Sequence, residues 1–297
     1  MSELDKILEE KKVLVADGAW GTEMIKMGLS TGETPELWNI RKPHLVKKIA
    51  KGYRDAGADI ILTNTFGANR LKLKRAGFEG DVKEINRIGV ELSKEWAGDS
   101  LVFASIGPTG EFLEPSGDFK EEDFVEVFSE QAEGFVEGGA DGVIIETMSD
   151  ANEALCALRA VRQRSSLPVG ISLAFNKDKT GFTTMMGLTA NQVVSSLMEQ
   201  NPDIIGANCG SITIEDMAGI TRIMKQFTSL PLWIKPNAGI PSVRDGETLY
   251  PQRPQEMASS IHSLIRQGAT IIGGCCGTTP EHIKLIREKV DSWRLRI

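Results

Sequence analysis

The sequence predicts a single (β/α)8 barrel of the TIM type, and three observations support this fold class. Short apolar runs rich in β-branched residues occur eight times along the 297 residues, with amphipathic stretches between them. Each run is almost continuously apolar, as expected of parallel strands that are buried on both faces. Eight alternations of strand and helix in a chain of this length match a (β/α)8 barrel. We therefore expect one domain over residues 1–297.

The expected strands are short and follow one another at similar spacings. In chain order they are Val13–Ala16, Ile60–Thr63, Val102–Ile106, Val143–Glu146, Val169–Leu173, Ile204–Ala207, Leu232–Lys235 and Thr270–Gly273.

Helical periodicity fills the segments between these strands. In residues 121–138 the apolar positions fall on one face of a helix. The last helix is expected to begin with Thr279 as its N-cap and Pro280 at its first position. The other expected helices are His44–Ala56, Val82–Trp96, Asp150–Arg164, Ala190–Glu199, Ile214–Phe227 and Pro254–Gln267.

An open doubly wound sheet is the structural alternative. Such a sheet usually carries a glycine fingerprint for dinucleotide phosphates after its first strand. The corresponding turn here reads DGAWGTE, which lacks the G-x-G-x-x-G spacing. The barrel is therefore favoured.

Composition and charge exclude several classes of function. Lys and Arg number 34 against 41 Asp and Glu, a net charge of −7, which disfavours nucleic-acid binding. The N-terminal segment MSELDKILEEKK is charged, and no apolar run is long enough to cross a bilayer. We expect a cytoplasmic enzyme with no membrane partner. Four cysteines are too few for a disulfide scaffold.

Polar residues gather where the expected strands end, which is the catalytic end of a barrel. Asp17 follows the first strand and Glu146 ends the fourth. Cys209 follows the sixth strand, and Cys275 and Cys276 follow the eighth. Three of the four cysteines are thus expected at one rim, whereas Cys156 lies in a helical pattern and is expected in the core.

Three interpretations of the rim cysteines are open. They could be buried thiols, or Cys275 and Cys276 could form a disulfide, which is strained between neighbours and disfavoured in reducing cytosol. They could also bind a metal, because the surrounding glycines free the backbone to turn adjacent sulfurs toward one ion. Three thiolates favour zinc with an open fourth position, which is typical of a catalytic site.

Such an ion is better suited to activating a thiol than to hydrolysis. Zinc with three thiolates carries a net charge of about −1 and is a poor Lewis acid for making hydroxide. It can still hold a substrate thiol in its deprotonated form. The sequence therefore predicts alkyl transfer to a thiol.

Other polar residues have two interpretations each. Asp17 and Glu146 could bind a substrate ammonium or could cap neighbouring loops. Asn237, in the segment PNAG, could contact the site or form a turn. The three histidines show no spacing typical of metal ligands and are expected on helices.

The chain resembles the homocysteine S-methyltransferase family almost from end to end. The motifs that carry the resemblance are DGAWGTE, ILTNTFGANR, SIGPTGE, ETMSD, NCG, PNAG and GGCCGTTPEH. Among the members, TNTFGANR and GPTGE are most similar to the homocysteine-binding module of cobalamin-dependent methionine synthases. The betaine-using branch has tyrosine where this chain has Thr147, which argues against a betaine donor.

The resemblance implies specific roles for the rim residues. It implies Cys209, Cys275 and Cys276 as zinc ligands, with the homocysteine sulfur in the open position. It further implies that Asp17 and Glu146 hold the substrate ammonium. It also implies that the backbone near Gly18 and Ala19 contacts the substrate carboxylate and that Asn237 lies near the metal.

We therefore expect zinc-dependent methylation of homocysteine to methionine. No stretch of the sequence resembles a corrinoid-binding module, so a methyl-corrinoid protein would dock in trans, unless the chain is a fragment of a longer enzyme. The alternatives are a sulfonium or betaine donor, a metal-free barrel lyase or isomerase, and a non-enzymatic scaffold for a corrinoid partner.

Overall fold

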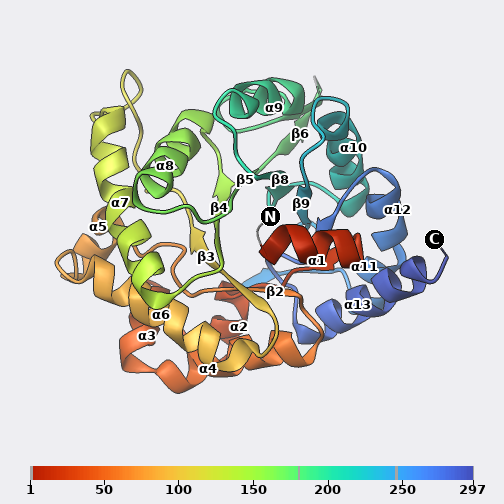
Figure 1. The fold of residues 1–297 in the computed structure, drawn as a ribbon, viewed down its shortest axis with the longest axis horizontal. Coiled ribbons are helices and arrows are strands. Elements are labelled where there is room, and N and C mark those ends of the chain that lie inside the picture. Colours follow the sequence, from red (N-terminus) through yellow and green to blue (C-terminus); the bar gives the residue numbers. More distant parts are fainter. Residues whose placement is uncertain (1–2, 180, 245–246, 297) are drawn as a thin grey trace.

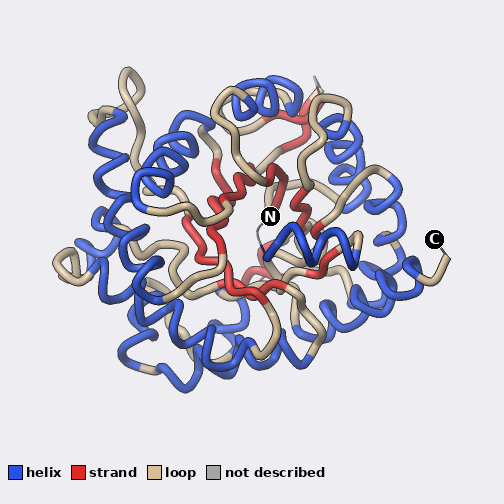
Figure 2. Tube along the Cα trace, in the orientation of Figure 1, coloured by secondary structure: helices blue, strands red, loops and turns tan. Residues whose placement is uncertain are grey.

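The computed structural model describes residues 3–179, 181–244 and 247–296. Eight parallel strands form one sheet in the order β1-β12-β9-β8-β5-β4-β3-β2, and they ring the centre of the molecule (Figures 1 and 2). A parallel bridge between Ala16 and Ile60 joins the two ends of the sheet. The predicted (β/α)8 barrel is thereby confirmed.

All eight predicted strands are present, with boundaries within two residues of those expected. They are β1 (Leu14–Val15), β2 (Ile60–Leu62), β3 (Leu101–Ile106), β4 (Gly142–Met148), β5 (Val169–Leu173), β8 (Ile204–Asn208), β9 (Leu232–Lys235) and β12 (Ile271–Ile272).

Helices surround the ring of strands (Figure 2). They are α1 (Glu3–Lys11), α2 (Gly21–Lys26), α3 (Trp38–Arg41), α4 (Pro43–Asp55), α5 (Arg70–Leu73), α6 (Val82–Ala97), α7 (Glu121–Gly138), α8 (Ala151–Arg164), α9 (Ala190–Met198), α10 (Ile214–Lys225), α11 (Pro254–Ser259), α12 (Ile261–Arg266) and α13 (Pro280–Arg294).

The helix expected over 254–267 is divided into α11 and α12 at Ser260. Next to this break, the Ser259 hydroxyl donates to the Glu256 carbonyl at 2.6 Å. A serine side chain that bonds a backbone carbonyl in the preceding turn competes with regular helix geometry.

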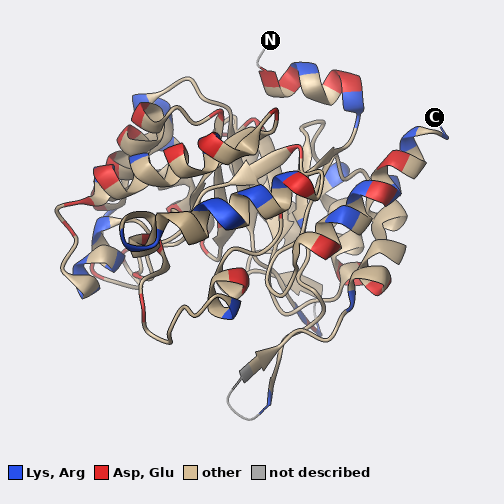
Figure 3. Ribbon diagram, turned by 90° about the horizontal axis from the view of Figure 1, so that it is seen from below, with Lys and Arg blue, Asp and Glu red and all other residues tan. Residues whose placement is uncertain are grey.

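The half of the barrel lumen at the N-terminal ends of the strands is apolar and is closed by α1. Phe103 and Trp233 stack there with ring centroids 6.2 Å apart. Glycine is required at position 206 next to this pair, since a Cβ on Gly206 would lie 1.9 Å from the carbonyl oxygen of Trp233. Leu4 of α1 belongs to the same buried cluster. This helix therefore covers the N-terminal end of the lumen, and Figure 3 shows it at one end of the molecule.

The half of the lumen at the carboxyl ends of the strands is polar. Every second side chain of a strand points into the lumen, because strand side chains alternate between the two faces. Residues two positions beyond the buried apolar ones continue inward toward the carboxyl ends of the strands. These residues include Ser105, Glu146, Ser172, Asn208 and Lys235, all of which are buried. The change to polar inward side chains near the carboxyl ends of β3, β4, β5, β8 and β9 thus creates the polar part of the site.

Two antiparallel hairpins that the sequence pattern does not indicate follow barrel strands at the same end. One pairs β6 (Asn176–Asp178) with β7 (Gly181–Thr183), and the other pairs β10 (Ser242–Arg244) with β11 (Glu247–Leu249). Figure 3 shows a hairpin projecting from the end of the molecule opposite α1. Among the described residues, no helix is both long and apolar enough to cross a membrane.

Candidate metal and substrate site

Three cysteines that are far apart in the sequence meet at the carboxyl ends of β8 and β12. The sulfurs of Cys209, Cys275 and Cys276 all lie within 4.8 Å of one another. The Cys209 and Cys276 sulfurs are 3.9 Å apart. Cys156 instead packs in the core at 3% exposure, so the structure separates it from the other three.

The backbone around Cys209 is specialised for this position. Cys209 directly follows β8 and has a φ of 59°, in the left-handed region. A Cβ on the next residue, Gly210, would lie 2.1 Å from the carbonyl oxygen of Phe175. Glycine is required there because the chain must pass close to this neighbouring loop.

A tight turn after β12 presents the other two sulfurs. The Cys275 N–H donates to the Pro236 carbonyl, and the Cys276 carbonyl accepts from the Ala238 N–H. The Thr278 hydroxyl closes the turn by donating to the Cys275 carbonyl at 2.7 Å. Adjacent cysteines therefore reach one point because the regular strand ends at Ile272 and the turn redirects the chain.

The sulfur arrangement fits a tetrahedral metal ion. A zinc–sulfur bond of about 2.3 Å places tetrahedral sulfur ligands roughly 3.8 Å apart, close to the 3.9 Å observed between Cys209 and Cys276. Without a cation the thiols hold their protons: the hydrogen bond with Cys275, and then burial, raise the pKa of Cys209 to about 12. Three thiolates at this site thus require a positive charge between them.

Next to the sulfurs lies a buried cluster of two acids and one base. Lys235 donates to Asp17 at 2.7 Å, and both side chains are almost completely buried. Burial disfavours the ammonium, but the charges of Asp17 and Glu146 raise the pKa of Lys235 above its usual value. Burial raises the pKa of Glu146, opposed by Lys235 and by the hydrogen bond from Ser105.

The two predicted ammonium-binding acids have different surroundings. The second oxygen of Asp17 accepts hydrogen bonds from the Trp20 indole and the Leu62 N–H, both at 2.8 Å. Both Asp17 oxygens are therefore occupied. One oxygen of Glu146 accepts from Ser105 at 2.7 Å, while the other has only a long 3.5 Å contact with Asn208. Glu146 thus has the greater remaining capacity for a hydrogen-bond donor.

Gly18 and Ala19, predicted near the substrate carboxylate, form a tightly packed turn. A Cβ on Gly18 would lie 2.8 Å from the Tyr53 ring. The Tyr53 hydroxyl donates to the Ala19 carbonyl at 2.5 Å, and the Ala19 N–H donates to the Thr278 hydroxyl at 3.1 Å. Thr278 therefore joins this turn to the cysteine turn, a link that no sequence motif indicates.

Asn237, the last predicted site residue, lies beside the cysteine turns. Its amide nitrogen donates to the Gly210 carbonyl at 2.9 Å. Its amide oxygen is buried and has no hydrogen-bond partner among the described residues. A buried acceptor without a partner, adjacent to three thiols, is chemically suited to a cation or to a donor group of a ligand.

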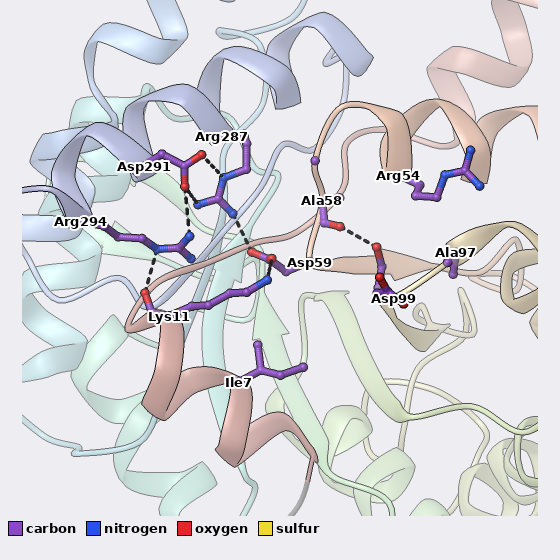
Figure 4. Close-up of a pocket in the computed structure, with 13 residues that line it drawn as sticks. Ile7, Lys11, Arg54, Ala58, Asp59, Ala97, Asp99, Arg287, Asp291 and Arg294 are labelled. Carbon is purple, nitrogen blue, oxygen red and sulfur yellow. Dashed lines mark hydrogen bonds and ion pairs between the residues drawn. The ribbon is translucent and has the colours of Figure 1, made fainter.

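A pocket of about 500 Å³ lies at the opposite, N-terminal end of the barrel. Figure 4 shows Lys11 and Arg287 converging on Asp59, and Asp291 between Arg287 and Arg294. These charges pair with one another across α1, α13 and the start of β2. We assign this region to holding the chain ends, because the charges drawn from α1 and α13 pair with Asp59 and with one another.

The fold and the site together define a (β/α)8 barrel with a metal-competent three-thiol centre at its catalytic end. The sequence model of the homocysteine S-methyltransferase family matches residues 14–290. The chain therefore belongs to the homocysteine S-methyltransferase family.

Individual relatives agree with this assignment. The chain is 29% identical over 299 aligned residues to methionine synthase from Mycobacterium leprae, covering 94% of this chain and 24% of that protein. It is 28% identical to methionine synthase from Mycobacterium tuberculosis, covering 94% and 25%. The chain thus spans about a quarter of the length of these curated relatives.

A solved structure has the same fold. The homocysteine methyltransferase MmuM from Escherichia coli, in its metallated form, superposes with a TM-score of 0.80 at 24% identity, covering 96% of this chain and 99% of that one. At this identity the likeness concerns the fold.

Proposed function

We propose that this chain catalyses zinc-dependent methyl transfer to the thiol of homocysteine, giving methionine. The observation that carries the proposal is the convergence of the Cys209, Cys275 and Cys276 sulfurs within 4.8 Å, next to the buried acids Asp17 and Glu146. A thiol-binding metal and an ammonium-binding carboxylate at one site match the two functional ends of an amino-acid thiol.

The residues of the chain divide the work. The three cysteines hold the metal, which when bound supplies the charge that keeps a substrate thiol deprotonated at neutral pH. Glu146 accepts hydrogen bonds from the substrate ammonium, and Lys235 limits the negative charge that Asp17 and Glu146 bring together. The turn at Gly18 and Ala19 is the proposed contact of the substrate carboxylate, and Asn237 the proposed contact beside the metal.

We propose a methyl-corrinoid carried by a partner protein, or by another part of a longer chain, as the methyl donor. With such a donor, the substrate sulfur would form the new S–C bond, the C–Co bond would break, and the electron pair of the C–Co bond would stay with the cobalt. The thiol proton passes to solvent. Two features support this donor: the methionine synthase relatives, and the exposed apolar residues Met185, Met186, Val243 and Leu249 on or beside the hairpins at this end of the barrel.

The metal role is tested by replacing single ligands. Cys209→Ser and Cys275→Ser variants should lose bound zinc and lower kcat/KM for homocysteine by at least about a hundredfold, because a site that loses a ligand loses both affinity and geometry. Zinc is measured by metal analysis after dialysis. Cys156→Ser is the matched control, since Cys156 lies in the core away from the site. Full zinc content and turnover in both ligand variants would contradict the proposal.

The donor is tested with a panel. Purified protein and homocysteine are incubated with methylcobalamin, a methylated corrinoid protein, S-methylmethionine, S-adenosylmethionine or betaine, and methionine is quantified. Methionine from the corrinoid donors alone supports the proposed donor. Methionine from a sulfonium or from betaine would replace it. No methionine from any donor would overturn the homocysteine assignment and favour a metal-free barrel enzyme or a scaffold for a corrinoid partner.

A further inference from the structure

We propose that Asn208 is a positioning residue that holds Glu146 and Cys275 in one rigid frame. It would thereby fix the distance between the ammonium-binding carboxylate and the thiol-binding metal. This inference rests on the proposed function, because it concerns how the site measures the length of its thiol substrate.

The orientation of the Asn208 amide is determined by its partners. Asn208 is the last residue of β8 and is fully buried. Its oxygen lies 2.9 Å from the Thr147 backbone nitrogen and 2.6 Å from the Ser172 hydroxyl. A backbone N–H can only donate, so the atom facing Thr147 must be the amide oxygen. The NH2 group therefore faces the opposite side.

The NH2 group faces both functional halves of the site. It donates one hydrogen to the Thr147 hydroxyl at 2.7 Å. The second hydrogen faces Glu146 Oε2 at 3.5 Å and Cys275 Sγ at 3.6 Å. One amide thus contacts a proposed substrate-binding carboxylate and a proposed metal ligand that is 67 residues away in the chain.

The backbone on both sides of this amide is also constrained. Thr147 and Cys209 are two of the few described non-glycine residues in the left-handed region, with φ of 60° and 59°. Such conformations persist when surrounding bonds hold them. Asn208 bonds Thr147 through both its backbone N–H and its hydroxyl, and it directly precedes Cys209. The same side chain therefore maintains the turn after Glu146 and begins the turn that presents a sulfur.

Two consequences follow from this geometry. An N–H directed at a thiolate stabilises its charge and orients it, as hydrogen bonds to metal ligands commonly do. A fixed spacing between Glu146 and Cys275 favours thiols whose amine and sulfur match that spacing. Loss of Asn208 should therefore change the electronic state of the metal site and weaken the preference for a thiol that carries the amine.

The test compares Asn208→Ala and Asn208→Asp with the wild-type protein. Asp has nearly the same shape and keeps an acceptor for Thr147 and Ser172, but it cannot donate to Cys275 when ionised. Asn86→Ala is the matched control, because Asn86 is a fully buried asparagine that donates to two backbone carbonyls on α6 and the loop before α5.

Two measurements are made on each protein. The first is the sulfur-to-metal charge-transfer absorption of the cobalt(II)-substituted protein, which requires no turnover. The second is the ratio of kcat/KM for homocysteine to that for 4-mercaptobutyrate, which lacks the amine. We expect both Asn208 variants to shift the absorption band and to lower the ratio at least tenfold, mainly through KM for homocysteine. Asn86→Ala should change neither.

Each outcome decides the inference. If Asn208→Asp keeps both the band and the ratio of the wild type, Asn208 is not a positioning residue. If Asn208→Ala does not fold, Asn208→Asp still supplies both measurements. If the wild type methylates no thiol, the proposed function fails on its own, and the cobalt band alone then supports or contradicts the frame between Asn208 and Cys275.

Discussion

At the scale of single residues, the most consequential side chain is Lys235. It ends an otherwise apolar strand and is 2% exposed, yet it pairs with Asp17 at 2.7 Å. A charge in such surroundings persists only when opposite charges and hydrogen bonds compensate it. Asp17 and Glu146 provide that compensation, and Lys235 in turn allows two buried acids to lie near three sulfurs. The burial of Asp17 and Glu146 in the polar half of the lumen thus depends on the ammonium group of Lys235.

Replacing Lys235 by methionine tests this dependence. Lys235→Met keeps the length of the side chain but leaves Asp17 buried without its partner, so the free energy of unfolding should fall by about 3–5 kcal/mol. Urea denaturation measures the loss. Lys177→Met, which removes the exposed lysine paired with the half-buried Asp216, should cost less than about 1 kcal/mol. The double variant Asp17→Asn/Lys235→Met should recover part of the loss, and equal costs for the buried and the exposed lysine would contradict this account.

At the scale of elements, α13 is tied to the site by an unusual cap. Thr279 is its N-cap residue, and His282, at helix position N3, completes a capping box with it. His282 Nδ1 accepts from the Thr279 N–H at 3.1 Å, and Nε2 faces the Gln252 carbonyl at 3.2 Å. Only the neutral ring protonated at Nε2 satisfies both contacts. The helix therefore begins correctly with a neutral histidine.

This cap predicts a pH-dependent stability. Burial, partly opposed by the bond to Gln252, lowers the pKa of His282 below its usual value. The unfolded chain then binds the proton at higher pH than the folded one, so the stabilisation is complete above about pH 6.5 and is lost as pH falls through the folded-state pKa. We expect the stability advantage of wild type over His282→Gln to shrink between pH 7.5 and pH 5 in urea denaturation. His44→Gln, an exposed histidine, is the control, and an advantage independent of pH would contradict the cap.

The sequence patterns predicted the positions of the strands and helices better than they predicted the contacts between these elements. A continuously apolar run such as Val169–Leu173 can be identified as a buried strand from sequence alone. The positions of the cysteines directly after strands six and eight then place them at one rim of the barrel. The burial of Lys235 was not predictable locally, because its partner Asp17 is 218 residues away. The role of Asn208 depends on four separate strand ends. The hairpin strands are three residues long, too short to show the apolar alternation that identifies a strand, and β6 and β10 are exposed.

At the scale of the whole molecule, the two ends of the barrel perform different tasks. The carboxyl end of the strands holds the sulfurs and the polar cluster. The N-terminal end holds α1 and α13 through Asp59, which accepts from Lys11 at 2.6 Å, Arg287 at 2.9 Å and the Val15 N–H at 2.8 Å. The apolar stack of Phe103 and Trp233 separates these regions. A five-residue strand such as β8 is about 17 Å long, and this length sets the distance between the two ends.

This separation predicts that stability and metal binding can be changed independently. Asp59→Ala leaves the Val15 N–H and two cations without a buried acceptor, and we expect a loss of at least about 1–3 kcal/mol in the free energy of unfolding. Zinc affinity, measured by chelator competition, should stay within about twofold of the wild type, because distant sites without shared partners act additively. Asp55→Ala, which breaks exposed pairs with Lys51 and Arg54, is the matched control and should cost less than about 1 kcal/mol.

A double variant tests whether the two ends of the barrel act independently. Cys209→Ser should remove the stabilisation that bound zinc gives the folded state, which amounts to about 2.7 kcal/mol at free zinc a hundredfold above its dissociation constant. Combined with Asp59→Ala, the two losses should add within about 0.5 kcal/mol in the presence of zinc. In excess chelator the Asp59→Ala loss should remain, while the zinc-linked part of the Cys209→Ser loss disappears. A zinc affinity reduced by Asp59→Ala as strongly as by Cys209→Ser would mean that the apolar stack transmits changes between the ends, and the lumen would then be one coupled unit.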